Sequence, residues 1–345
     1  MSKVIILGAG SSKECGLPLG EEIWEFIEDY DNEPWYRYLS SIFPRFSDNF
    51  LQGHKNKYPK FELALSLIDC ANKSSLVNSY KKVFILKYGG LLLPLYKDED
   101  PFVENLRYNM EDWYYPFFKK SLEKDKDTVF VSISYDGLID EVLSKLDIEN
   151  RTGSFTYGFK IYDLEGRETR SDSHGMLLLK PHGSINLMEC PTCGKVFDYF
   201  CDPTEVDPPE GNKECCYCKK KLDTLMLVQG CHDFNKENPY YRSINEKLSN
   251  IISGADNISI IGYSLPDYDT DILQAFLKGA MNNKNRESMN IDIIGYHDPK
   301  AYGEEGKRQE QEIKSKYGAI FNQSVRYHGE GFKEYARACL ACKET

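Results

Sequence analysis

Short, largely apolar runs recur along the chain, and each is followed by glycine or polar residues. The five clearest runs cover residues 3–7, 129–133, 176–179, 258–261 and 291–294, and residues 225–228 form a weaker sixth. Continuous apolar runs of this length are typical of strands that are buried on both faces of a parallel sheet. The runs therefore predict such a sheet.

Apolar residues at helical spacing follow several of these runs. One such pattern begins at Pro18, others follow Asp136 and Asp269, and a last helix is expected over residues 332–340. Proline fits the first turn of a helix, and a period of about 3.6 residues marks a helix with one buried face. Strands that alternate with helices predict an α/β fold with a doubly wound, Rossmann-like parallel sheet.

Two stretches interrupt the alternation and divide the chain. Residues 31–125 are rich in aromatic residues and show no alternating strand pattern, which predicts a helical insertion. Residues 186–226 are polar and cysteine-rich, and so short a stretch needs a metal or a crosslink to hold it together. The Rossmann-like domain is then expected to combine residues 1–30, 126–185 and 227–345.

The charge balance excludes some functions. The chain has 54 Asp and Glu against 43 Lys and Arg, and its net charge is −11. We expect no nucleic-acid partner, because sequence-independent binding needs positive charge to displace counterions. No apolar run approaches the roughly 18 residues of a membrane-spanning helix, and the first residues lack the apolar region of a signal peptide. We therefore expect no membrane association.

The cysteine count indicates a reduced, cytoplasmic protein. The 11 cysteines are an odd number, so at least one lies outside any intramolecular disulfide pattern. A chain of 345 residues does not need a disulfide scaffold to be stable.

Four of the cysteines have the spacing of a metal site. Cys190 and Cys193 form one Cys-x-x-Cys pair, and Cys215 and Cys218 form a second. Four thiolates can hold a tetrahedral zinc, and they leave no open position for catalysis, so the expected role of the zinc is structural. Cys216 could replace Cys215 at the cost of a shorter pair spacing, and buried free thiols are the alternative to a metal.

Glycine and serine residues follow the first predicted strand. They are Gly8, Ala9, Gly10 and Ser11. Glycine lets a backbone approach an anion closely, and a helix N-terminus favours a phosphate. The spacing differs from GxGxxG, since the next glycine comes only at Gly16, so a plain strand-to-helix turn explains this motif equally well.

Polar residues also follow three later strands. Ser134 and Asp136 follow the second, His182 follows the third, and Gly262 and Ser264 follow the fourth. Ligands bind at the carboxyl ends of strands in open parallel sheets, and an imidazole suits a general base near neutral pH. Simpler roles remain open: Asp136 can cap the next helix, His182 can make a loop hydrogen bond, and the fourth motif can be a turn.

Taken together and in this order, the motifs resemble the sirtuin-like superfamily. The similar segments are GAGSSKECGLP, SISYDGLI, LLKPHGS, the four-cysteine module and GYSLPDYD. They cover the α/β part of the chain from end to end, and five motifs in one order are specific. The resemblance is closest to the bacterial branch found in antiphage defence, which hydrolyses NAD to nicotinamide and ADP-ribose. Protein deacylases usually carry Asp-Phe-Arg where this chain has Leu19-Gly20-Glu21.

The resemblance implies that NAD is the substrate and lies across the strand ends. The implied cofactor-binding residues are Gly8, Ala9, Gly10 and Ser11 at the phosphates and Gly262 and Ser264 at the adenosine ribose. Proteins of this branch are often silent until a partner rearranges them. We therefore expect the helical insertion to contact a protein partner or a second copy of the chain.

The implied catalytic residues are His182, Ser134 and Asp136. His182 would take a proton, and Asp136 would face the positive charge that develops on the ribose. The family pattern has Asn where this chain has Ser134, and a hydroxyl reaches less far and offers fewer hydrogen bonds than an amide. We therefore expect weak or conditional NAD hydrolysis. The alternatives are a non-catalytic NAD or ADP-ribose binding subunit and an NAD-dependent deacylase.

Overall fold

The computed structural model describes eleven stretches of the chain. They are residues 3–17, 19, 37, 41, 101–150, 155–171, 175–198, 213–226, 239–267, 269–295 and 299–342. Residues 42–100, which make up most of the expected insertion, lie outside the described residues. Among the helices that the structure describes, none has the length and apolar character needed to cross a membrane.

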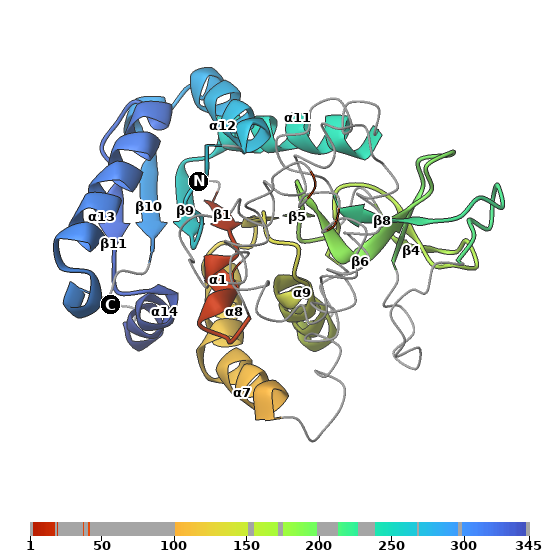
Figure 1. Ribbon diagram of the computed structural model, residues 1–345, viewed down its shortest axis with the longest axis horizontal. Helices are drawn as coiled ribbons and strands as arrows, with labels where there is room; N and C mark the ends of the chain where they lie inside the picture. The colour runs from red at the N-terminus through yellow and green to blue at the C-terminus, as the bar shows by residue number, and fades with distance from the viewer. Residues whose placement is uncertain are drawn as a thin grey trace.

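A six-stranded parallel sheet lies at the centre of the described chain (Figure 1). Its strands are β1 (Lys3–Leu7), β2 (Val129–Ser132), β5 (Leu178–Leu179), β9 (Asn257–Ile261), β10 (Asn290–Ile294) and β11 (Arg326–His328). They lie in the order β11-β10-β9-β1-β2-β5, and every neighbouring pair is parallel. Numbered along the chain, this is the 3-2-1-4-5-6 order of the Rossmann fold. The α/β fold class expected from the sequence is confirmed.

The strand predictions hold for the buried strands, including β5 at one edge, and fail for β11 at the other edge. The five clear apolar runs coincide with β1, β2, β5, β9 and β10. The edge strand β11 is not visible as an apolar run, because its sequence RYH is half-buried to exposed. The weaker run at residues 225–228 begins in a strand of a second sheet, so its expected place in the parallel sheet is wrong.

Helices lie on opposite sides of the large sheet. The longer ones are α7 (Pro101–Asn109), α8 (Tyr115–Lys124), α9 (Leu138–Asn150), α11 (Pro239–Gly254), α12 (Thr270–Asn282), α13 (Pro299–Phe321) and α14 (Phe332–Ala341). Shorter turns are α1 (Gly10–Lys13), η5 (Met110–Tyr114) and η6 (Arg286–Ser288). In Figure 1, α11 and α12 lie at the top of the view and α8, α9 and α14 at the bottom, with strands between them.

Residues 101–124, the longest described part of the expected insertion, are helical and share the core of the large sheet. The ring of Phe332 in α14 meets Trp113 and Phe117 edge to face, with centroids 5.1 and 5.0 Å apart. Phe118 packs against Phe130 of β2 at 5.8 Å. These rings tie the segment to both the sheet and the last helix, while the domain boundaries stay predictions.

A second, smaller sheet carries the cysteine module. Its strands are β3 (Ile161–Tyr162), β4 (Glu168–Arg170), β6 (Gly183–Glu189), β7 (Val196–Asp198) and β8 (Asp223–Met226), in the order β4-β3-β7-β6-β8. A small separate core of Met188, Phe197, Leu222 and two cysteines lies within it. Strand β6 begins at Gly183, directly after His182, so the loop that carries the histidine leads directly into the small sheet.

Candidate functional site

Two glycine-containing loops meet where the strand order reverses. The chain leaves β1 toward β2 on one side and leaves β9 toward β10 on the other. The N–H of Gly8 donates to Ile261 O, and that of Gly10 donates to Gly262 O, both at 2.9 Å. Ligands of open α/β sheets bind at this kind of reversal.

The glycines are required because these loops touch backbone to backbone. A Cβ on Gly8 would lie 2.5 Å from Gly262 O, and a Cβ on Gly262 would lie 2.2 Å from Ser11 N. Gly262 also has a φ of +63°, which other residues rarely adopt. The motifs predict that Gly8 approaches a phosphate and that Gly262 lies at the adenosine ribose, whereas the close approach seen here is between the two loops.

Several donors of the first loop bind within the protein. The N–H of Ser11 donates to Gly8 O at 2.9 Å, and that of Ser12 to Ala9 O at 3.3 Å. The Ser11 hydroxyl also donates to Gly8 O, at 2.7 Å. A phosphate held by Gly8, Gly10 or Ser11 N–H groups would therefore replace a contact that the loop makes itself. Ser264, expected at a ribose, is exposed on the second loop.

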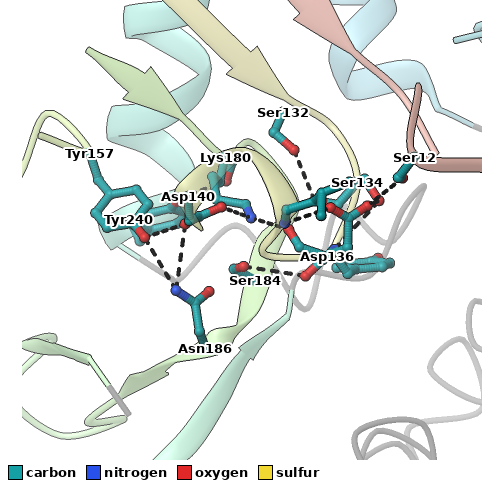
Figure 2. A network of polar contacts seen from close by, with 12 residues as sticks. Ser12, Ser132, Ser134, Asp136, Asp140, Tyr157, Lys180, Ser184, Asn186 and Tyr240 are labelled. Atoms are coloured by element: carbon teal, nitrogen blue, oxygen red, sulfur yellow. Dashed lines mark hydrogen bonds and ion pairs between the residues drawn. The ribbon is translucent and has the colours of Figure 1, made fainter. Parts of the chain in front are cut away.

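Asp136 joins the loops that follow β1 and β2 (Figure 2). Its Oδ2 accepts hydrogen bonds from the hydroxyls of Ser12, at 2.8 Å, and Ser134, at 2.5 Å. Its Oδ1 accepts from the N–H of Leu138 at 3.0 Å, so it also caps the first turn of α9. The simpler role considered for Asp136 is thus present together with its place at the strand ends. Ser12 was missed by sequence reasoning, although the repeated serine of GAGSS marks it.

A fully buried lysine holds the Asp136 loop from behind. Lys180 has no exposed surface, and its Nζ donates to Asp136 O at 2.5 Å and to Asp140 Oδ2 at 2.9 Å. The Tyr157 hydroxyl donates to Asp140 Oδ1, and Asn186 Nδ2 donates to the Tyr157 oxygen at 3.2 Å. Figure 2 shows this network beside the Asp136 group. Sequence reasoning missed the ion pair, since its partners come from LLKPHGS and the first turn of α9.

His182 bridges two loops on opposite sides of β1. Its Nδ1 lies 3.1 Å from Ile133 O, in the loop after β2, and its Nε2 lies 3.1 Å from Asp269 Oδ1, in the loop after β9. Because β1 lies between β2 and β9, the imidazole spans the point where the strand order reverses. The side chain is 5% exposed.

Asp269 is a further site residue that sequence reasoning missed. It lies in GYSLPDYD at the N-cap position of α12, but its carboxylate makes no capping bond. Instead Oδ2 accepts a hydrogen bond from the Tyr263 hydroxyl, and Oδ1 faces His182. Burial lowers the pKa of His182, but the charge and hydrogen bond of Asp269 outweigh burial and hold that pKa above its ordinary value.

The four cysteines of the module converge. The sulfurs of Cys190, Cys193, Cys215 and Cys218 all lie within 4.8 Å of one another. Cys190 Sγ is 3.3 Å from Cys218 Sγ, and Cys193 Sγ is 3.6 Å from Cys215 Sγ. A zinc with four Zn–S bonds of about 2.3 Å needs sulfurs about 3.8 Å apart, so the donor set fits this ion.

Two matching turns present these sulfurs. The N–H of Cys190 donates to Lys195 O, and the carbonyl oxygen of Cys190 accepts a hydrogen bond from the N–H of Gly194. Cys215 makes the same two bonds, with Lys220 O and with the N–H of Lys219. Gly194 and Lys219 follow the second cysteine of each turn, and both have positive φ, +66° and +59°. Burial raises the pKa of Cys190, but hydrogen bonds from Cys193 N–H and the Cys218 thiol bring it to about 7. The first turn therefore favours a thiolate at Cys190, whereas burial raises the pKa of Cys193 to about 12 and the hydrogen bond with Cys190 raises the pKa of Cys218.

Comparisons with known proteins give structural similarity at low identity. No protein-family model and no curated protein matches the chain in sequence. A solved structure on "the structural basis for sirtuin substrate affinity" is 11% identical, with 98% of this chain and 91% of that chain covered and a TM-score of 0.41. A second, on "the mechanism and regulation of Sir2 enzymes", is 13% identical, with 92% and 93% covered and a TM-score of 0.39. The fold class rests on the strand order of this chain.

Proposed function

We propose that this chain binds NAD across the carboxyl ends of the large sheet and hydrolyses it to nicotinamide and ADP-ribose. One observation carries the proposal: His182 spans the reversal of strand order, beside the β1 and β9 loops. In a sheet of this order, dinucleotides bind across such a reversal. The motif resemblance to the sirtuin-like superfamily supplies NAD as the dinucleotide.

Cleavage of the nicotinamide–ribose bond builds positive charge on the ribose. The Asp136 carboxylate, 3% exposed and held by two hydroxyls, supplies a fixed negative charge near the strand ends. His182 accepts a proton from the attacking water once one of its ring nitrogens has a lone pair available. The four cysteines hold a structural zinc, which stabilises the small sheet and takes no part in the reaction.

A direct assay tests the proposal. Purified protein is incubated with NAD alone, and nicotinamide and ADP-ribose are separated by chromatography. Release of both without an acylated peptide supports hydrolysis, and loss of release in a His182→Ala variant that remains folded ties it to this site. Turnover that requires an acylated peptide would identify a deacylase. Neither binding nor cleavage of NAD would overturn the proposal.

A non-catalytic binding protein is the second candidate. The Ser134 hydroxyl donates to Asp136, and both nitrogens of His182 face oxygen acceptors. Groups that hydrogen-bond within the protein are less available to activate a water molecule, which favours binding without turnover. Saturable NAD binding by calorimetry, without nicotinamide release, would select this function.

The biological setting follows from the same resemblance. We propose a cytoplasmic role in antiphage defence. In this role the chain does not hydrolyse NAD until a protein partner or a second copy of the chain binds through the insertion. Bacteria that express the wild-type chain should resist phage, and bacteria that express His182→Ala should not. Equal phage sensitivity in both strains would contradict this role.

A further inference from the structure

We infer that Asp269 is a positioning residue that keeps His182 as a doubly protonated imidazolium in the resting chain. His182 then becomes a base only after its Nε2–H bond breaks, the electron pair stays on Nε2 and the proton leaves to water. The catalytic meaning of this step rests on the proposed function, while the charge of the ring does not.

The first argument is the kind of atom that each ring nitrogen faces. Nδ1 faces the carbonyl oxygen of Ile133, and Nε2 faces the carboxylate of Asp269, each at 3.1 Å. A neutral imidazole has one donor and one acceptor nitrogen, so one of these contacts would set a lone pair against an oxygen. The imidazolium donates at both nitrogens and satisfies both contacts.

The second argument is the surroundings of the Asp269 carboxyl group. It has no exposed surface, and the Tyr263 hydroxyl donates to its Oδ2. It also precedes the first turn of α12, where the helix dipole favours negative charge. A buried carboxylate needs a counter-charge, and His182 provides it in the one ion pair that the described residues give Asp269.

A second carboxylate near His182 also raises the pKa of the imidazole. Asp271 in the first turn of α12 adds a second negative charge, and it is hydrogen-bonded to Tyr241 of α11. The Tyr135 ring lies 6.1 Å from the imidazole, at an interplanar angle of 39°. Tyr317 of α13 fixes Tyr263 from behind, since its hydroxyl donates to Tyr263 O at 2.9 Å. Burial alone opposes the charge on His182, so loss of Asp269 should let burial prevail.

An NMR titration of the histidine rings tests this directly. The His182 signal is assigned by its loss in His182→Gln, and it is followed in the wild-type chain, Asp269→Asn and Asp267→Asn. Asp267 is the matched control, because it lies in the same loop but is exposed and pairs with Lys316. We expect wild type and Asp267→Asn to titrate above the ordinary 6.5, and Asp269→Asn to titrate lower by about one unit or more.

A second readout links the ring to turnover. The acidic limb of nicotinamide release against pH should move down with the His182 titration in Asp269→Asn, and Asp269→Glu should restore the upper position. If Asp269→Asn fails to fold, the wild-type titration still decides. The inference is overturned if the His182 ring of the wild-type chain is already neutral at about pH 6.5. It is also overturned if folded Asp269→Asn gives the same His182 titration as wild type. Absence of NAD cleavage with the expected titrations would overturn the proposed function alone.

Discussion

The hydroxyl of Ser134 donates to the carboxylate of Asp136 at 2.5 Å, two residues further along the same loop. Asp136 receives the Ser12 hydroxyl at the same oxygen, so three side chains from two loops form one group. Ser134 thus fixes a carboxylate, and it stands where the resemblance places an amide.

Replacement of Ser134 by Asn should raise NAD hydrolysis. An amide supplies donors and an acceptor beyond the reach of the hydroxyl, and one such preorganised contact is typically worth about 10²–10³ in turnover. Nicotinamide release from the two proteins is compared under identical conditions. Ser134→Ala is the control, because it removes the bond to Asp136 without adding an amide. Equal and robust rates in all three would show that this position does not limit turnover.

Removal of His182 should cost stability as well as activity. His182→Ala leaves the carboxylate of Asp269 buried without a cation, which typically costs about 3–5 kcal/mol of unfolding free energy. The double variant His182→Ala with Asp269→Asn should recover part of this loss, while NAD cleavage stays absent. Urea unfolding of the two single variants and the double variant measures the coupling. Additive losses would mean that the two residues do not interact.

The same pair predicts a pH dependence of stability. The pKa of His182 is raised in the folded chain, so its contribution is complete below the unfolded value of 6.5. The contribution is lost as pH rises from there through the folded pKa. Urea unfolding at several pH values should therefore show wild type losing stability relative to Asp269→Asn across this window. Parallel profiles for the two proteins would contradict the prediction.

The buried pair of Lys180 and Asp140 should stabilise far more than an exposed pair of similar length. Lys180→Met leaves Asp140 without its cation and frees the Asp136 carbonyl, so we expect a loss of about 3–5 kcal/mol. Lys119→Met breaks the exposed pair with Glu149, which is 3.0 Å long against 2.9 Å for Lys180 and Asp140, and should cost at most about 1 kcal/mol. Chemical unfolding compares the two variants. Similar losses would show that burial of the Lys180 pair contributes nothing.

The cysteine module should hold one zinc per chain. Elemental analysis of protein purified under reducing conditions measures it, and a chelator should unfold the small sheet as it removes the ion. Cys193→Ser should lower zinc content, whereas Cys216→Ser should not, since Cys216 lies outside the cluster of four sulfurs. A folded chain without zinc would show that the thiols need no metal.

Sequence reasoning succeeded where burial alone determines the pattern. The strands β1, β2, β9 and β10 are apolar because both of their faces are covered, and such runs are visible without a structure. The run at residues 225–228 looks the same, but it begins in a strand that pairs antiparallel with β6. An apolar run does not reveal its partner, so the sheet to which it belongs could not be read.

The site was predictable by position but not by pairing. Asp136 and His182 follow buried strands, and parallel strands bring their carboxyl ends to one edge. That His182 meets Asp269 depends on loop paths between residues 87 positions apart, which no local pattern encodes. The pair of Lys180 and Asp140 was missed for the same reason. Charged residues are rarely buried without a partner, and no local pattern shows which partner a residue has. The roles assigned to these residues stay predictions.

The backbone contact between the β1 and β9 loops is independent of the chemistry of side chains such as Ser134. Gly8, Gly10 and Gly262 extend the pairing of β1 with β9 into the two loops through main-chain atoms. The frame therefore tolerates no side chain at these positions, and the contact itself uses no side chain from elsewhere along the strand ends. Residues such as Ser134 can be exchanged during divergence without shifting the frame, so related chains can differ in chemistry while they keep one architecture.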